Sequence, residues 1–197
     1  AYAQAHPKQV SELIVRGIFT LRKEELRWFY QEGASSLFPD YWEDYLAPIP
    51  AEERGDLIAA YHKRLTGDDR DAQIQAARAW SQWEGRTITL YPDQSNSHTY
   101  IADHFALAFA RIENHYFTHA GFMQENQLLD NAHLLKDIPG VIIQGRYDCC
   151  TPAKTAWDLH KAWPQAEFHM VPDAGHAFNE PGILKLLLEA TDRYARQ

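Results

Sequence analysis

Features that would indicate a membrane, an oxidising compartment or a nucleic acid are scarce in this sequence. Cysteine occurs only as the adjacent pair Cys149 and Cys150, which disfavours a structural disulfide within the chain and indicates a reducing, cytoplasmic compartment. No basic stretch precedes an apolar one and no apolar run reaches transmembrane length, so we predict neither a signal peptide nor a membrane span. Basic residues are outnumbered by acidic ones, 19 to 27, and the net charge of −8 disfavours nucleic acid as a partner.

A nucleophile motif is also missing. The pattern G-x-S-x-G, which presents a catalytic serine on a turn between a strand and a helix, occurs nowhere in the 197 residues. Residues 33–37 (GASSL) lack the final glycine, and Ser95 and Ser97 lie in a polar loop with no strand before them. His115 and His119 have a spacing that zinc ligands can have, but there is no H-E-x-x-H arrangement and no third ligand. We therefore expect neither a metal nor an organic cofactor.

The most informative stretch that is present runs from Pro139 to His176. Hydrophobic residues make up 45% of the chain and aromatic residues 13%, so a folded core is expected. Within the stretch, residues 141–143 (VII) and 167–171 (EFHMV) read as strands of a parallel sheet. Asp148 follows the first strand and His176 follows the second. Since ligands bind beyond the carboxyl ends of parallel strands, we predict that this Asp and this His meet at one edge of the sheet.

An Asp and a His brought together in this way can support general base catalysis. The His takes a proton from a nucleophile, and the carboxylate holds the imidazole in the right tautomer. The spacing alone leaves another interpretation open, in which Asp148 caps the next helix and His176 is a loop residue. That helix is expected from Pro152 to about Trp163, with Thr151 as its N-cap and Pro152 at its first position.

The rest of the chain predicts a helical insertion between sheet segments. A strand is expected over residues 12–16, and residues 92–99 read as a loop. From about Thr20 to Gly121, helix signals repeat and strand signals nearly vanish. Helices are expected there over 21–31, 39–46, 51–65, 68 or 69 to about 83, and 101 to about 117. The last of these helices is expected to be buried on nearly every face, and residues 87–91 are expected to be extended. After the insertion, a closing amphipathic helix is expected over 183–196.

Several longer segments resemble one family. These are RGIFTLRKEEL (16–26), WSQWEG (80–85), FALAFARIENHYF (105–117), GRYD with DAGHAF, and the tail EPGILKLLLEATDRYA (180–195). Together they resemble the prolyl aminopeptidases, or proline iminopeptidases, of the α/β-hydrolase superfamily, over nearly the whole chain. The resemblance implies an α/β-hydrolase fold, a mostly parallel sheet with flanking helices and an inserted all-helical cap. It divides the chain into 1–19 and 122–197 (hydrolase domain) and 20–121 (cap domain).

The resemblance also implies an activity. The family's nucleophile elbow precedes a segment like residues 1–6, so we expect the chain to begin inside the helix after it, without the first strands and the serine. The complete protein would release N-terminal proline from peptides through an acyl-enzyme, with His176 as base and acid and Asp148 orienting it. The expected partner is a peptide that begins with proline. Whether an upstream segment or a second copy of the chain is a further partner is left open by the sequence.

Glutamates in the predicted cap are the candidates for binding the substrate's amino group. A buried cation needs a carboxylate partner, and Glu113 lies in an apolar helix while Glu84 lies between Trp83 and Gly85. Residues alone leave open that both are solvated, but the resemblance implies that both bind the amine. It further implies that aromatic side chains line a pocket for the proline ring. Phe29 stands in this pocket at a position where relatives can have Tyr. Arg16 is expected to hold the two carboxylates or the neighbouring backbone in place. The pocket residues are Phe19, Phe29 and Phe117, for which ordinary core packing is the alternative.

Two other functions stay open. Another hydrolase on the same scaffold, such as an esterase or an epoxide hydrolase, would have no use for a buried pair of carboxylates. Alternatively, the chain is an inactive fragment or a partner-binding module, since an unpaired strand edge invites pairing with another chain.

Overall fold

The structure is a computed structural model that describes residues 1–91, 100 and 102–196. It contains two compact units. Unit 1 is formed by residues 1–20 and 126–197, so the two ends of the chain fold together. Unit 2 is formed by residues 21–125. Each unit has its own core and is described separately.

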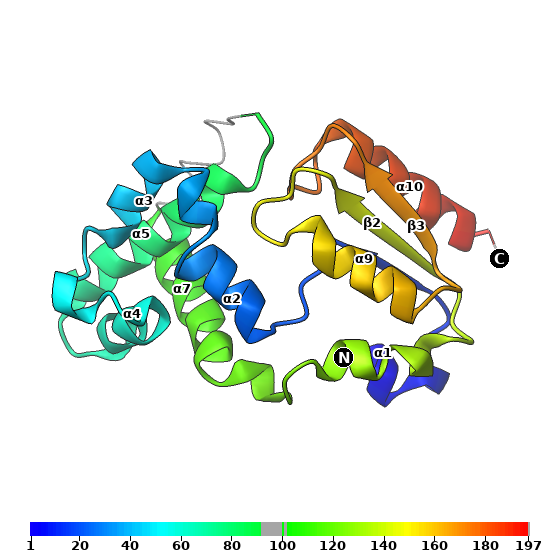
Figure 1. The fold of residues 1–197 in the computed structure, drawn as a ribbon, viewed down its shortest axis with the longest axis horizontal. Helices are drawn as coiled ribbons and strands as arrows, with labels where there is room; N and C mark the ends of the chain where they lie inside the picture. Colours follow the sequence, from blue (N-terminus) through cyan, green and yellow to red (C-terminus); the bar gives the residue numbers. More distant parts are fainter. Residues whose placement is uncertain (92–99, 101, 197) are drawn as a thin grey trace. The chain divides into compact units, whose positions relative to one another are not determined.

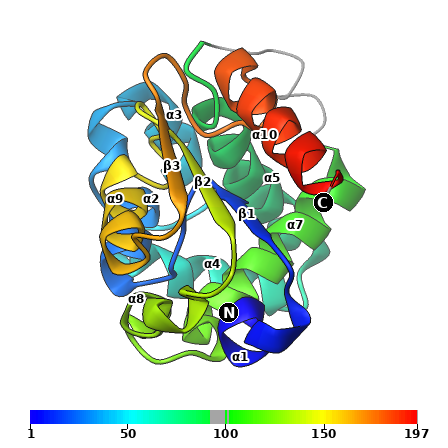
Figure 2. The same cartoon turned by 90° about the vertical axis from the view of Figure 1, so that its right-hand side faces the viewer.

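Unit 1 is built on a parallel sheet of three strands in the order β1-β2-β3; Figure 1 labels β2 and β3, and Figure 2 labels all three. The strands are β1 (Leu13–Arg16), β2 (Gly140–Gly145) and β3 (Glu167–Val171). Ile143 of β2 lies opposite Arg16 on one side and His169 on the other. Every residue of β2 is buried, as expected for a central strand covered on both faces. All three strands that the hydrophobic runs predicted are confirmed.

Helices cover both faces of this sheet, with α9 (Ala153–Ala162) on one and α10 (Pro181–Tyr194) on the other (Figure 2). The alternation of side chains along β2 separates the two cores. Ile142 points to the α9 side, while Val141 and Ile143 pack with the apolar residues of α10.

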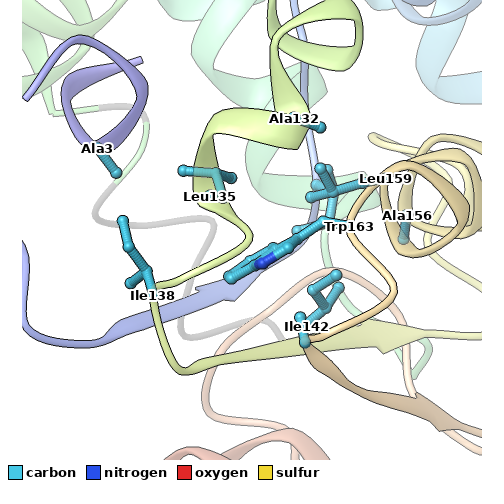
Figure 3. Packing of buried hydrophobic residues seen from close by; sticks show 10 residues of the cluster. Ala3, Ala132, Leu135, Ile138, Ile142, Ala156, Leu159 and Trp163 are labelled. Carbon is cyan, nitrogen blue, oxygen red and sulfur yellow. The ribbon is translucent and has the colours of Figure 1, made fainter. Parts of the chain in front are cut away.

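The α9 side is centred on Trp163, which is fully buried among small and branched apolar side chains (Figure 3). Gly140 permits this packing, because a Cβ there would lie 1.9 Å from the indole ring. Short elements close this side of unit 1: α1 (Tyr2–Ala5), the 3-10 helices η1 (Pro7–Gln9) and η5 (Ala132–Leu135), and α8 (Gln127–Asp130).

Among the described residues of unit 2, every secondary-structure element is a helix. Helix α5 packs against α7 and α3, and α4 packs against both α5 and α7. Its core is aromatic, with Tyr45, Tyr61, Trp80 and Trp83 almost completely buried. The elements are α2 (Lys23–Tyr30), η2 (Ala34–Ser36), α3 (Pro39–Leu46), η3 (Ala51–Glu53), α4 (Leu57–Thr66), α5 (Arg70–Thr87), α7 (Asp103–Thr118) and η4 (Ala120–Phe122).

Local capping residues begin two of these helices. The Asp56 side chain accepts a hydrogen bond from the Ala59 N–H at the start of α4. Asp69 accepts from the N–H groups of residues 71 and 72 at the start of α5. Of the two predicted caps for this helix, Asp68 and Asp69, the second is therefore correct. Among the described residues, no helix is both long enough and apolar enough to cross a bilayer.

Three expectations about unit 2 are wrong. The single helix over residues 51–65 is interrupted, because Asp56 adopts an extended conformation and starts α4 anew. Residues 87–91 contain no strand, since Thr87 ends α5 and Ile88 keeps a helical backbone. Helix α7 is not buried on nearly every face: its buried residues are Ala106, Ala110 and Asn114, and Ile112 is 60% exposed. Residues 92–99 and Ile101 lie outside the described residues.

Candidate active site

Asp148 lies in the turn that follows β2, with its carboxylate completely removed from solvent. Oδ1 accepts hydrogen bonds from the N–H groups of Cys150 (3.0 Å) and Thr151 (2.8 Å). Oδ2 accepts from the Thr151 hydroxyl and from the Gln144 side-chain amide, both at 3.0 Å. Burying an ionised carboxylate is costly unless donors surround it, and here both oxygens have them.

The same turn corrects one expectation. Pro152, not Thr151, occupies the N-cap position of α9. The Thr151 side chain turns back to Asp148 instead, because an Asp at the start of a tight turn draws the following N–H and O–H groups towards its carboxylate.

His176 follows β3 and meets Asp148 in the same unit. Its Nδ1 lies 2.8 Å from Oδ2 of Asp148, and the side chain is 21% exposed. The end of β1 supports this loop, since Arg16 Nη1 donates to the backbone carbonyl of His176 at 2.6 Å. Gly17 packs against the ring: a Cβ at this residue would lie 2.8 Å from Cε1 of His176. The geometry thus brings together the Asp and the His that the sequence placed at one sheet edge.

This pair has the arrangement that a general base requires. With a proton on Nδ1 donated to Asp148, the imidazole keeps Nε2 as its basic nitrogen. Within the described part of the chain, no hydrogen bond to Nε2 is present, so this atom is available to take a proton from a nucleophile.

Cys150 lies close enough to this pair to raise the question of a metal. Ligand atoms of Asp148, Cys150 and His176 lie within 4.8 Å of one another. However, a metal there would have to displace donors, because both oxygens of Asp148 accept hydrogen bonds and Nδ1 of His176 already faces Oδ2.

The neighbouring Cys149 is not activated as a nucleophile. Burial, and then the charge of Asp148, raises the pKa of its thiol, which works against formation of a thiolate.

Unit 2 contains a second group of ionisable side chains, built around Tyr30 of α2. The Tyr30 hydroxyl donates to Glu84 of α5, and its ring stacks on Trp80 with centroids 4.5 Å apart. The Trp80 indole N–H donates to Glu113 of α7 at 2.9 Å. Three helices therefore bring both predicted amine-binding carboxylates to one aromatic pair.

The electrostatics of this group differ from those of Asp148. Burial raises the pKa of Glu113 to about 7, and the hydrogen bond from Trp80 opposes only part of this shift. Burial, followed by the charges of Glu113 and Glu84, raises the pKa of Tyr30 well above its usual value, so its hydroxyl stays a donor. Two carboxylates in such surroundings would be stabilised by a bound cation.

The aromatic residues predicted to bind proline are found in both units. In unit 2, the Phe117 ring lies 5.1 Å from that of Tyr30, and Phe29 is buried with its ring 5.3 Å from that of Trp83. In unit 1, Phe19 and Arg16 line an apolar cavity of about 430 Å³.

Sequence reasoning missed Tyr30, Trp80 and Gln144. Phe29 lacks the hydroxyl that relatives can have at this residue, but the next residue, Tyr30, donates a hydroxyl to Glu84. Tyr30 and Trp80 are aromatic residues within predicted helices, a pattern that usually indicates core packing, and the segment WSQWEG that contains Trp80 carried a family resemblance but no role for Trp80 itself. Gln144 offered a clearer one, because it is a polar residue inside a run that otherwise reads as a buried strand.

Comparison with known proteins places the chain in a wider context. Residues 1–182 match the family described as alpha/beta hydrolase fold. A solved structure of an alpha/beta fold family hydrolase from Bacillus anthracis str. Sterne covers 97% of the chain with a TM-score of 0.53 at 17% identity. The chain covers 61% of that structure, and the likeness concerns the fold.

Curated relatives are much more similar in sequence. The chain is 56% identical over 195 residues to a protein named proline iminopeptidase from Xylella fastidiosa (strain Temecula1 / ATCC 700964). It is 54% identical to a probable proline iminopeptidase of Leptolyngbya boryana and 52% identical to a proline iminopeptidase of Arabidopsis thaliana. At least 98% of the chain is aligned in each case, but it spans only 62%, 62% and 51% of these proteins' lengths.

Proposed function

Because the chain belongs to the alpha/beta hydrolase fold family, we propose that it forms part of a serine aminopeptidase that releases N-terminal proline from peptides. The observation that favours a peptidase over an esterase or an epoxide hydrolase is the pair Glu84 and Glu113 around Tyr30, because a neutral substrate needs no buried carboxylates. The names of the relatives support the same substrate class. In this proposal, unit 1 belongs to the hydrolase domain and unit 2 is the inserted cap domain.

In the proposed reaction, a serine from polypeptide outside the 197-residue sequence attacks the carbonyl carbon of the N-terminal proline. His176 Nε2 takes the serine proton and then gives it to the nitrogen of the departing peptide, which leaves a prolyl ester on the serine. The same nitrogen then takes a proton from water, which attacks the ester carbonyl carbon, and gives that proton to the serine oxygen as the ester bond breaks and proline is released. Asp148 keeps Nδ1 protonated throughout, and positioned acid–base catalysis of this kind contributes about 10²–10⁴-fold.

The amino group of the substrate is assigned to Glu84 and Glu113. The pKa of Glu113 lies near 7 in the unliganded protein, so a bound ammonium group would stabilise its ionised form. Phe19, Phe29 and Phe117 are proposed to supply apolar walls for the pyrrolidine ring, and Arg16 to order the backbone beside the site. A cytoplasmic location is included in the proposal, because Cys149 and Cys150 are adjacent and both are thiols.

The decisive experiment compares three substrates on the purified protein: a prolyl anilide, an alanyl anilide and a butyrate ester. Fast turnover selective for proline is expected when a serine-bearing segment is present. The matched control is the 197-residue chain alone, which should turn over none of the three. Ester turnover without preference for proline would reject the peptidase. Absence of turnover with the serine-bearing segment present would favour an inactive or partner-binding protein.

A further inference from the structure

Gln144 is a polar residue in the centre of the sheet of unit 1. It lies near the end of β2, the middle strand, and its side chain is fully buried. Oε1 accepts from the backbone N–H of Ile18 at 2.9 Å, while Nε2 donates to Oδ2 of Asp148 at 3.0 Å and to the carbonyl of Thr151 at 2.9 Å. A buried N–H at residue 18 requires an acceptor, so these partners fix which way the amide faces.

The N–H that holds Gln144 belongs to the end of β1, which also contacts His176. Ile18 directly follows Gly17, whose backbone adopts a φ of +54° and packs against the imidazole. Arg16 donates to the His176 carbonyl. Residues 16–18, the last residue of β1 and the two that follow it, therefore contact the backbone and the ring of His176 and, through Gln144, the carboxylate of Asp148.

Backbone groups hold only one of the two oxygens of Asp148. Oδ1 is held by the N–H groups of Cys150 and Thr151, whereas Oδ2 is held by side chains, including the amide of Gln144. The terminal torsion of an Asp side chain has a broad energy minimum. Because both oxygens turn together about this torsion, the donors to Oδ1 and those to Oδ2 set the direction of Oδ2 jointly, and Gln144 supplies one of them from the sheet itself.

We propose that Gln144 is a positioning residue that couples the end of β1 to the Asp148–His176 pair and keeps Oδ2 directed at Nδ1 of the imidazole. Its importance for catalysis rests on the proposed function, in which His176 is the base. Its effect on the orientation and tautomer of His176 does not rest on that function. Because the amide donates to a charged oxygen, its removal should affect the pair more than the loss of a neutral hydrogen bond would.

The test replaces Gln144 with an apolar residue of similar size, Gln144→Met. Gln73→Met is the matched control, since Gln73 is also a buried amide but donates to the Gly67 carbonyl in unit 2. The readout is the pair of imidazole ¹⁵N resonances of His176 in histidine-labelled protein, which reports the tautomer. We expect the Nδ1–H tautomer in the unsubstituted and control proteins, and a mixture of tautomers in Gln144→Met.

Activity gives a second readout wherever prolyl anilide is turned over. Gln144→Met should lower kcat by about 10²-fold, the loss typical of a misplaced catalytic group, while KM changes by less than about 3-fold. Unchanged His176 resonances and unchanged kcat, together with a loss of stability equal to that of Gln73→Met, would overturn the proposal. If the unsubstituted protein has no peptidase activity with the serine-bearing segment present, the proposed function fails while the resonances still test the coupling.

A second substitution covers the case in which Gln144→Met does not fold. Gln144→Glu keeps an acceptor for Ile18 but can donate at most one proton, so it cannot serve both Asp148 and Thr151. It should again give mixed tautomers. Should both variants unfold, the two side-chain amide protons of Gln144 in the unsubstituted protein decide the question. Slow exchange with solvent is expected, and rapid exchange would overturn the proposal.

Discussion

Asp148 in unit 1 is a buried carboxylate and Glu113 in unit 2 a largely buried one, but their surroundings are opposite. Asp148 accepts from two backbone N–H groups, a hydroxyl and an amide, and it also faces His176. Among the described residues, Glu113 has one hydrogen-bond donor, the indole N–H of Trp80, and burial raises its pKa to about 7. Hydrogen-bond donors within the fold therefore offset the cost of desolvating Asp148, whereas the cost of desolvating Glu113 is largely not offset.

This difference separates two uses of a buried acid. A carboxylate surrounded by donors is held in one orientation and can orient a neighbour, which is the role proposed for Asp148 beside the His176 ring. A carboxylate with few donors is destabilised in the free protein and gains most when a cation arrives.

The largest effect is expected from Asp148→Asn. An amide of the same shape can present an N–H to the imidazole and so favour the wrong tautomer, which should lower kcat for prolyl anilide by about 10⁴-fold. Steady-state kinetics provide the measurement. Asp158→Asn on α9, where the carboxylate pairs with Lys154 and Lys161, should leave kcat unchanged. Equal losses in both variants would contradict the role of Asp148.

The second prediction concerns the pH dependence of stability in Glu113→Gln. The folded pKa, about 7, lies above the unfolded value of 4.5, so the folded protein binds the proton more tightly. The stabilisation from protonated Glu113 is complete below pH 4.5 and is lost as the pH rises to about 7. Above that pH the buried charge costs on the order of 3 kcal/mol.

Glu113→Gln should remove this loss. Urea unfolding at pH 5 and pH 8 should therefore show a smaller decrease in the variant than in the unsubstituted protein. Glu189→Gln on α10 is the control, because that carboxylate is largely exposed, and it should preserve the original difference. An unchanged pH dependence in Glu113→Gln would show that the carboxylate is hydrated after all.

A smaller effect should come from Tyr30→Phe. This change removes the hydroxyl that donates to the buried carboxylate of Glu84, and the loss should lower the free energy of unfolding by about 2 kcal/mol. Tyr61→Phe removes a hydroxyl that donates to the neutral carbonyl of Tyr45 and should cost about 1 kcal/mol. Chemical denaturation can compare the two, and a larger loss in Tyr61→Phe would contradict the assignment.

The smallest effect should come from an exposed carboxylate, Asp69 at the start of α5. It accepts two backbone N–H groups at 3.0 and 3.1 Å, so Asp69→Ala should cost about 1 kcal/mol. Its neighbour Asp68 is also exposed, and Asp68→Ala should change stability by less than about 0.5 kcal/mol. Thermal unfolding of both variants checks the difference, and equal losses would reject Asp69 as the functional cap.

Much of unit 1 could be predicted from the sequence. Residues 141–143 form a strand because branched apolar side chains lie there between Gly140 and Gly145, and residues 167–171 form one between Pro164 and Pro172. The Asp148–His176 pair followed from the same logic, since two consecutive parallel strands end at the same edge of a sheet. These are local patterns joined by one rule of topology.

The sequence alone thus determined the strands, most helices and the edge at which Asp148 meets His176. Only the tertiary structure decided that Tyr30 and Trp80 serve Glu84 and Glu113, that Gln144 connects β1 to Asp148, and that Thr151 turns back to the carboxylate. It also decided that Ile112 on α7 faces solvent. Hydrogen-bond partners and exposure depend on segments far apart in the chain, and no periodicity within one segment records which neighbour will cover it.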